Sequence, residues 1–207
     1  MAGNNSAKHD PYAGMPAYDE QSGNLNVVIE TPKESRNKFK YDDSRGIFRL
    51  GGVLPAGAVF PFDFGFVPST LAEDGDPLDM LVLMDESAFA GCLVAVRLIG
   101  VIEAEQTESG GTTERNDRLI GVASESKDNA EVRSLDQVNE HLVGEIEHFF
   151  VSYNQMRGKV FKPVGRFGPE RARKLVDEGM ARFKKPPAAS GNGKDALDRK
   201  NSAAKAR

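Results

Sequence analysis

The sequence predicts an α+β fold, in which helices pack on the outside of an antiparallel sheet or barrel. Three observations lead to this expectation. Segments with strand character come first, helical periodicity appears only after residue 134, and strands and helices do not alternate as in βαβ folds. With 207 residues, 39% of them hydrophobic and 28% charged, the chain is long enough for one domain with a sizeable core.

The expected strands are rich in β-branched and aromatic residues and are separated by turn residues. The segments 39–43 and 46–50 are expected to form a hairpin around a Ser-Arg-Gly turn. The segment 117–124 is expected to pair with 92–105 after a glycine-rich turn at 107–114. The segments are 25–31, 39–43, 46–50, 80–84, 92–105 and 117–124.

Residues 55–70 contain three prolines and four phenylalanines. Proline at this density excludes a helix and disfavours a central strand. We therefore expect an ordered apolar loop there, with Phe62 and Phe66 packed in the core.

Two helices are expected late in the chain. Ser134–Gln137 has the form of a capping box, and apolar residues then repeat at helical spacing as far as Tyr153, with Gly158 as a stop signal. A second helix is expected at roughly 169–183, because Pro169 suits a first helical turn.

The charge distribution separates an acidic body from a basic C-terminal segment. The chain carries −4 overall, whereas residues 183–207 carry +5, which leaves −9 for residues 1–182. We expect disordered tails at 1–24 and 184–207, with the folded domain at 25–183. We interpret the basic tail as solvated and expect neither a nucleic-acid nor a membrane partner.

The location is expected to be cytoplasmic. The N-terminal residues contain no apolar stretch typical of a signal peptide, and no window approaches the ~20 apolar residues that a membrane span needs. The single cysteine, Cys92, cannot form an internal disulfide, which fits a reducing compartment.

Residues 73–79, EDGDPLD, place Asp74, Asp76 and Asp79 within six positions. Pro77 prevents a helix, so the three carboxylates can converge from one turn, and oxygen ligands of this kind suit Mg²⁺ or Mn²⁺. An EF-hand is excluded, because its required glycine and glutamate positions hold Asp79 and Asp85. A solvated acidic turn remains the alternative at this point.

DGDPLD resembles the acidic signature of the soluble, magnesium-dependent family I inorganic pyrophosphatases. Further segments follow in that family's order across residues 26–183: NVVIE, SRNK, FPFDFGFVP, TLAEDGDPLDMLVLM and IEHFFVSYNQMRGK. The resemblance implies a small, OB-like antiparallel β-barrel with flanking C-terminal helices. It also implies a cytoplasmic homo-oligomer, hexameric in bacterial members, that hydrolyses inorganic pyrophosphate or a related phosphoanhydride.

The resemblance also implies a role for individual residues. Asp74, Asp79 and Asp76 would hold Mg²⁺ or Mn²⁺, and Asp76 would also take the proton of the attacking water. Glu30 would be the acidic group closing the first strand, and Lys38 would contact a phosphate. Two further substrate contacts would come from Tyr153 and from Arg118, which stands in the place of a family lysine.

Several positions depart from the family pattern. This chain has Lys40 where the family has a glutamate, and Gly51-Gly52 where it has Asp-Arg. The chain has Phe60 and Phe64 in place of two family tyrosines. It has Asp63 in place of an asparagine and Asn154 in place of a lysine. The family pattern also has metal-ligand aspartates at two further positions, one of which is Asn116 in this chain, while the other falls near Gln106. Arg49, Arg97 and Lys159 are candidates to replace the guanidinium missing at Gly52.

These departures leave three functions open. One is hydrolysis of inorganic diphosphate. Another is hydrolysis of an organic phosphoanhydride or phosphate ester in a pocket made more apolar by Phe60 and Phe64. The third is a binding or assembly role for a catalytically degenerate member of the family.

Overall fold

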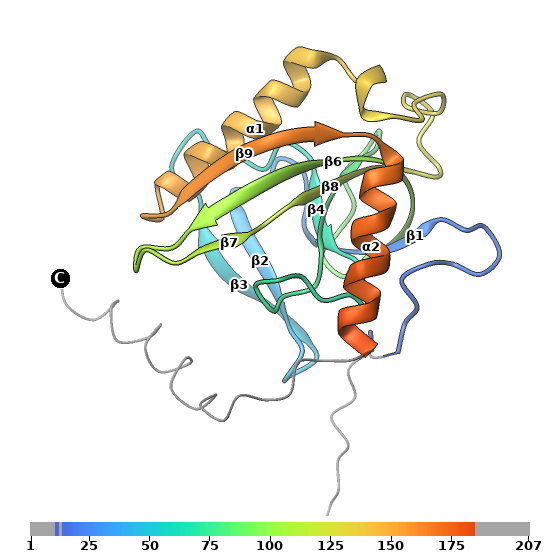
Figure 1. Ribbon diagram of the computed structural model, residues 1–207, viewed down its shortest axis with the longest axis horizontal. Coiled ribbons are helices and arrows are strands. Elements are labelled where there is room, and N and C mark those ends of the chain that lie inside the picture. Colours follow the sequence, from blue (N-terminus) through green and yellow to red (C-terminus); the bar gives the residue numbers. More distant parts are fainter. Residues whose placement is uncertain (1–10, 13, 185–207) are drawn as a thin grey trace, which may run out of the picture.

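The computed structural model describes residues 11–12 and 14–184, in which five strands close into a barrel (Figure 1). β1 pairs antiparallel with β4 along one edge and with β6 along the other, which joins the two ends of the strand order β1-β4-β5-β8-β6. The barrel therefore has no open edge at β1. Its strands are β1 (Leu25–Thr31), β4 (Asp63–Phe66), β5 (Asp79–Leu83), β6 (Leu93–Thr107) and β8 (Arg118–Ala123).

The remaining strands extend this barrel. β6 is 15 residues long, and its second half pairs with β7 (Thr113–Arg115) and β9 (Val160–Phe167). β2 (Asn37–Asp42) and β3 (Ile47–Val53) form a separate two-stranded hairpin, as expected. This hairpin brings Lys38 and Lys40 out beside the barrel.

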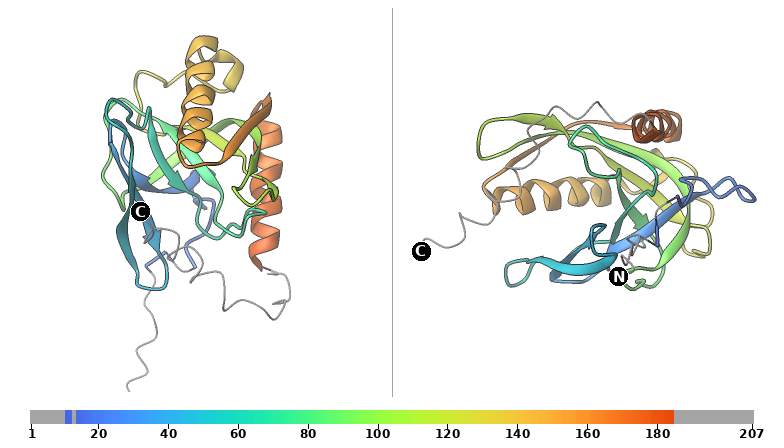
Figure 2. Two further views of the ribbon diagram at one scale, coloured as in Figure 1. Left: turned by 90° about the vertical axis from the view of Figure 1, so that its left-hand side faces the viewer. Right: turned by 90° about the horizontal axis from the view of Figure 1, so that it is seen from below.

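Two hydrophobic cores lie on opposite faces of the strands. In β5, Met80 and Val82 belong to one core while Leu81 and Leu83 belong to the other, and all four are buried. This two-sided burial explains why the strand is a continuous apolar run. α1 (Glu140–Gln155) packs into the core that contains Leu81, and α2 (Pro169–Lys184) into the other, so the helices cover different sides of the barrel (Figure 2).

The structure confirms the α+β class and corrects some details. β5 and β8 pair in parallel, so the sheet is not wholly antiparallel. The expected loop at 55–70 contains the short central strand β4, because Pro61 and Pro68 flank it and none of its own residues is proline. Phe66 is buried in β4, and Phe62 packs against the core, as expected.

Two helical details also differ. The capping box at Ser134–Gln137 forms, but it caps a 3-10 turn at Leu135–Gln137, whereas α1 begins after Asn139, whose side chain accepts a hydrogen bond from the His141 N–H. The sequence analysis missed β9, because its period-2 pattern is interrupted by Pro163 and Gly165.

The expected tails fall largely outside the described residues, which exclude 1–10, 13 and 185–207. The disorder expected there and the domain boundaries 25–183 remain predictions. Residues nearer the barrel do make contacts: Ala17 is fully buried, Tyr18 bridges to Leu25, and Tyr12 packs edge-on against Tyr41. Within the described part of the chain, no helix is long and apolar enough to cross a membrane.

Gly65 provides a test of barrel closure. A Cβ atom on Gly65 would lie 2.1 Å from the carbonyl oxygen of Val28, a contact between two backbones that no side-chain movement relieves. We expect Gly65→Ala to lower the free energy of unfolding by at least about 3 kcal/mol, the upper end of typical overpacking costs.

The matched control is Gly144→Ala in α1, where a Cβ meets nothing within 4 Å. This variant should gain about 1 kcal/mol from helix propensity. Urea unfolding measures both, and equal stability of the two variants would contradict the close packing of β1 on β4.

Candidate active site

The acidic loop, residues 72–79, is a compact turn. The Ala72 N–H donates to the Asp76 carbonyl oxygen at 2.8 Å, and the Asp76 N–H donates to Asp74 Oδ1 at 3.1 Å. Gly75 has φ +84°, which L side chains rarely adopt, so glycine is required at the tip. The loop thus presents Asp74 and Asp76 side by side before the chain enters β5 at Asp79.

α2 holds the base of the acidic loop. The Leu71 N–H donates to the Gly179 carbonyl oxygen at 3.0 Å, and Arg182 Nε donates back to the Leu71 carbonyl oxygen at 2.9 Å. The Leu78 N–H is bound by Thr70 Oγ1 at 3.1 Å. The first end of the loop is thus bound to a helix more than a hundred residues further along the chain, and the second end is bound to Thr70, just before the loop.

Two cations of the chain contact the acidic cluster. Lys40 Nζ lies 3.5 Å from Asp76 Oδ2, and Arg118 Nη1 lies 2.7 Å from Asp79 Oδ2. Burial alone would lower the pKa of Lys40, but the carboxylates of Asp76, Glu30 and Asp79 together raise it. The structure therefore brings residues from β1, β2, β5 and β8 into one charged site.

Glu30 lies buried at the end of β1 behind this cluster. Its Oε1 accepts a hydrogen bond of 2.7 Å from the Tyr41 N–H. Burial raises the pKa of Glu30 to about 7, and the charge of Asp79 adds to the effect, whereas the Tyr41 N–H, Lys38 and Lys40 oppose it. Glu30 can therefore exchange a proton near neutral pH.

The donors of the acidic loop suit a divalent ion in part. Asp74 is exposed, yet its pKa is raised to about 6, chiefly by desolvation from the surrounding protein and in addition by the charges of Asp79 and Asp76, against the opposing effects of the Asp76 N–H and Arg118. Crowded like charges of this kind are relieved by a cation. In residues 11–12 and 14–184, no three carboxylate, imidazole or thiol groups are grouped to hold a metal. Mg²⁺ commonly uses one or two carboxylates and completes its shell with water and substrate phosphates.

Lys38 sits in a cage of aromatic rings. Its Nζ lies 5.1 Å from the ring centroid of Phe64, 5.2 Å from that of Tyr153 and 5.9 Å from that of Phe60. The faces of aromatic rings attract a cation, so the rings fix the position of the ammonium group. Phe60 and Phe64, which carry no hydroxyl, therefore help to position Lys38.

The side of the site formed by β6 and the β7–β8 connection carries two amide side chains. Asn116 Nδ2 donates to Gln106 Oε1 at 3.0 Å, and Arg118 Nη1 donates to Asn116 Oδ1. Asp117 lies on the other side of the strand, where it accepts hydrogen bonds from Arg115 Nη2 and the Ala104 N–H. Arg118 is only 5% exposed, and its assignment to substrate binding remains a prediction.

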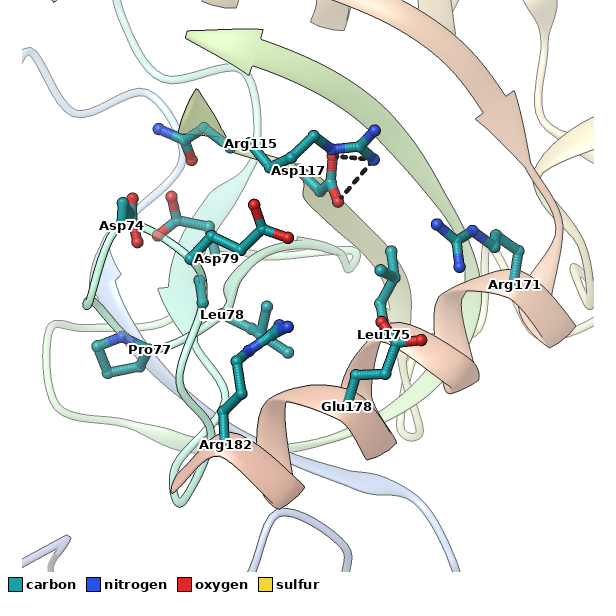
Figure 3. Close-up of a pocket in the computed structure, with 13 residues that line it drawn as sticks. Asp74, Pro77, Leu78, Asp79, Arg115, Asp117, Arg171, Leu175, Glu178 and Arg182 are labelled. Atoms are coloured by element: carbon teal, nitrogen blue, oxygen red, sulfur yellow. Dashed lines mark hydrogen bonds and ion pairs between the residues drawn. The ribbon is translucent and has the colours of Figure 1, made fainter. Parts of the chain in front are cut away.

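A hollow of about 170 Å³ adjoins the acidic loop on the α2 side (Figure 3). Asp74 and Asp79 face it from the loop, and Arg171, Glu178 and Arg182 face it from α2. Arg171 is already paired with Glu103, at 2.6 Å. Lys38 and Tyr153 do not line this hollow, so it lies beside the predicted phosphate-binding groups and does not include them.

None of the three candidates for the missing guanidinium is placed at Gly52. Arg49 lies 3.7 Å from Asp42, Lys159 lies 2.5 Å from Glu108, and Arg97 donates to carbonyl oxygens at 129–132. Gly52 is the register partner of Lys38, and a Cβ added there would meet nothing within 4 Å.

The sequence analysis missed Arg157. Its guanidinium lies 5.4 Å from the centroid of the Tyr153 ring, and its Nη1 donates to the Tyr153 hydroxyl. The spacing of four residues, one helical turn, was the available signal.

The fold and the site define a small closed β-barrel protein with acidic and basic groups gathered at one side of the barrel. The family described as inorganic pyrophosphatase matches residues 27–184, and the chain belongs to this family. The resemblance seen in the sequence is thereby confirmed.

Individual relatives agree with this assignment. The inorganic pyrophosphatase of Geobacillus stearothermophilus is 41% identical over 159 residues, which cover 77% of this chain and 93% of that protein. The crystal structure of the inorganic pyrophosphatase from Thermus thermophilus has a TM-score of 0.75 at 36% identity and covers 82% of this chain and 97% of its own. The crystal structure of an inorganic pyrophosphatase from Neisseria gonorrhoeae has a TM-score of 0.76 at 28% identity, and the match covers 85% of this chain and 100% of that one.

Glu30 provides a test of the electrostatics. Its raised pKa means that the folded protein binds more protons than the unfolded chain between pH 4.5 and about 7, so stability falls as the pH rises through this window. Glu30→Gln keeps an oxygen for the Tyr41 N–H and removes the titration. The free energy of unfolding of the natural protein, relative to this variant, should fall by on the order of 2–3 kcal/mol from pH 4.5 to above pH 7.

Chemical unfolding with a chelator present, at steps of pH, measures this difference. Glu86→Gln, at an exposed glutamate, is the matched control and should follow the natural protein. Parallel curves for the natural protein and Glu30→Gln would show that Glu30 is already ionised in the folded protein.

Proposed function

We propose that the protein hydrolyses inorganic diphosphate to two phosphates. One observation carries the proposal: the acidic loop, Glu30 and the basic side chains of the β2–β3 hairpin and β8 meet in one site, connected by the Lys40–Asp76 and Arg118–Asp79 ion pairs. A site with both signs of charge suits an anionic substrate that arrives with a cation. The relatives named inorganic pyrophosphatase support the same substrate.

The cation we propose is Mg²⁺, with Mn²⁺ as a substitute, held by Asp74, Asp76 and Asp79. Asp79 contacts Arg118 through Oδ2, and a carboxylate has two oxygens, so this pair alone does not remove Asp79 from the set. When bound, such an ion supplies positive charge that makes a water more acidic and offsets charge on the phosphates.

The side chains of the protein would then divide the reaction among them. The oxygen of the attacking water bonds to one phosphorus while Asp76 accepts the water's proton, and the P–O bond between this phosphorus and the bridging oxygen breaks. Lys38, held by its aromatic cage, binds an oxygen of the departing phosphate. The Tyr153 hydroxyl offers a further contact, and Glu30 can supply a proton near neutral pH.

Inorganic diphosphate is favoured over an organic ester because Phe60 and Phe64 are 1–2% exposed and hold Lys38. They therefore do not form an open apolar pocket for an organic group. The cytoplasmic location and the hexameric assembly implied by the resemblance remain proposals.

Phosphate release from diphosphate tests the function. We expect the natural protein to release phosphate in the presence of Mg²⁺, and Asp76→Asn to lower kcat by about 10²-fold or more, because an amide cannot accept the water's proton. Asp128→Asn, the same change at an exposed aspartate, should leave kcat unchanged. Equal rates for Asp76→Asn and the natural protein would exclude Asp76 as the base, and no release by any of them would exclude the function.

Gly52→Arg tests whether the site lacks a cation for phosphate. The position faces Lys38 across the hairpin and has room for a side chain. We expect the KM for diphosphate to fall by about tenfold, the effect of one charge-assisted hydrogen bond. Gly144→Arg in α1 adds the same charge away from the site and should not change KM, so a similar fall in both would point to a general effect of charge.

A further inference from the structure

Arg118, at the start of β8, is a buried cation with several polar and aromatic neighbours. Its Nη1 contacts Asp79 Oδ2 at 2.7 Å, the Asp117 carbonyl oxygen at 3.0 Å and Asn116 Oδ1. Its guanidinium carbon lies 4.9, 5.3 and 5.9 Å from the ring centroids of Phe150, Phe161 and Phe64. Oxygen atoms and aromatic faces together fix this buried cation in one place.

On the side of Arg118 away from Asp79, the neighbouring polar side chain is the amide of Asn116, which is hydrogen-bonded to the amide of Gln106. Asn116 donates to Gln106 Oε1 at 3.0 Å, and Gln106 Nε2 donates to Glu108 Oε1 at 2.8 Å, where Lys159 also binds. The oxygens of both amides are therefore already used. A divalent cation on this side would meet two uncharged donors and a fixed positive charge in contact with them.

The loop side of the same site is different. Lys40 is 41% exposed along its side chain, and its Nζ lies 3.5 Å from Asp76, so it can move aside at little cost. Asp74 and Asp76 therefore remain accessible to a cation. The Arg118 side chain, by contrast, is only 6% exposed and cannot leave without stranding a buried charge.

We propose that Arg118 is a built-in counter-cation that closes the β6–β8 side of the site to divalent metal, so that metal binds only at the acidic loop. The proposal rests on the proposed function for its substrate, but its claim concerns where the metal binds. In this arrangement one arginine charge, fixed by the fold, pairs with Oδ2 of Asp79 on the β6–β8 side, and the second oxygen of Asp79 stays available at the acidic loop.

Counting bound Mn²⁺ tests the proposal without diphosphate present. Equilibrium dialysis of the full chain gives the number of ions per chain for the natural protein and for two variants. The double variant Gln106→Asp/Asn116→Asp adds carboxylates but keeps Arg118, and it should bind the same number as the natural protein. The triple variant, which adds Arg118→Lys, shortens the cation and should gain about one ion per chain.

An extra ion in the double variant, or no gain in a folded triple variant, would overturn the proposal. Because the triple variant changes buried groups, its fold is checked by circular dichroism. If it does not fold, anomalous diffraction from Mn²⁺-soaked crystals of the natural protein decides: manganese bound only to the acidic-loop carboxylates Asp74, Asp76 and Asp79 supports the proposal, and manganese bound to Asn116 or Gln106 overturns it.

The two proposals fail separately. Absence of phosphate release with the Mn²⁺ count as expected would reject the hydrolase function and leave Arg118 as the counter-cation. Phosphate release together with manganese at Asn116 would reject the counter-cation and leave the function.

Discussion

The structure depends first on closure of the barrel at β1, which pairs with β4 on one side and β6 on the other. All seven residues of β1 are buried, and Gly65 in β4 allows the two backbones to approach. Closure also determines the site, because Glu30 ends β1 next to the entry of the β2–β3 hairpin. The strand that closes the barrel therefore carries Glu30 and leads into the hairpin that carries Lys38 and Lys40.

Charge balance explains the arrangement of the site better than any single contact does. Carboxylates on the acidic loop and on β1 face Lys40 and Arg118, and the pKa values of Asp74 and Glu30 are raised, chiefly by desolvation and in addition by neighbouring carboxylates. Aromatic rings supply the remaining support, since Phe64 lies within cation–π distance of both Lys38 and Arg118. Phenylalanine at position 64 thus offers no hydroxyl but presents a ring that both cations contact.

Most of the fold could be predicted from the sequence, because strand and helix periodicity is strong wherever one element packs on another. The predictions failed at β4, where flanking prolines hid a four-residue strand, and at β9, where proline and glycine broke the pattern. The acidic loop was singled out by the spacing of its own aspartates, whereas the roles of Glu30, Lys38 and Tyr153 were implied by the resemblance and remain predictions. The Gln106–Asn116 pair and the position of Arg157 depend on side-chain geometry that linear order does not contain.

The acidic loop is held by hydrogen bonds between Leu71 and the far end of α2, at Gly179 and Arg182. Helix ends fray more readily than helix centres, so solvent exchange of the Leu71 amide hydrogen is coupled to the opening of the last turns of α2. The protection of that one amide therefore reports how firmly the C-terminal helix holds the acidic loop.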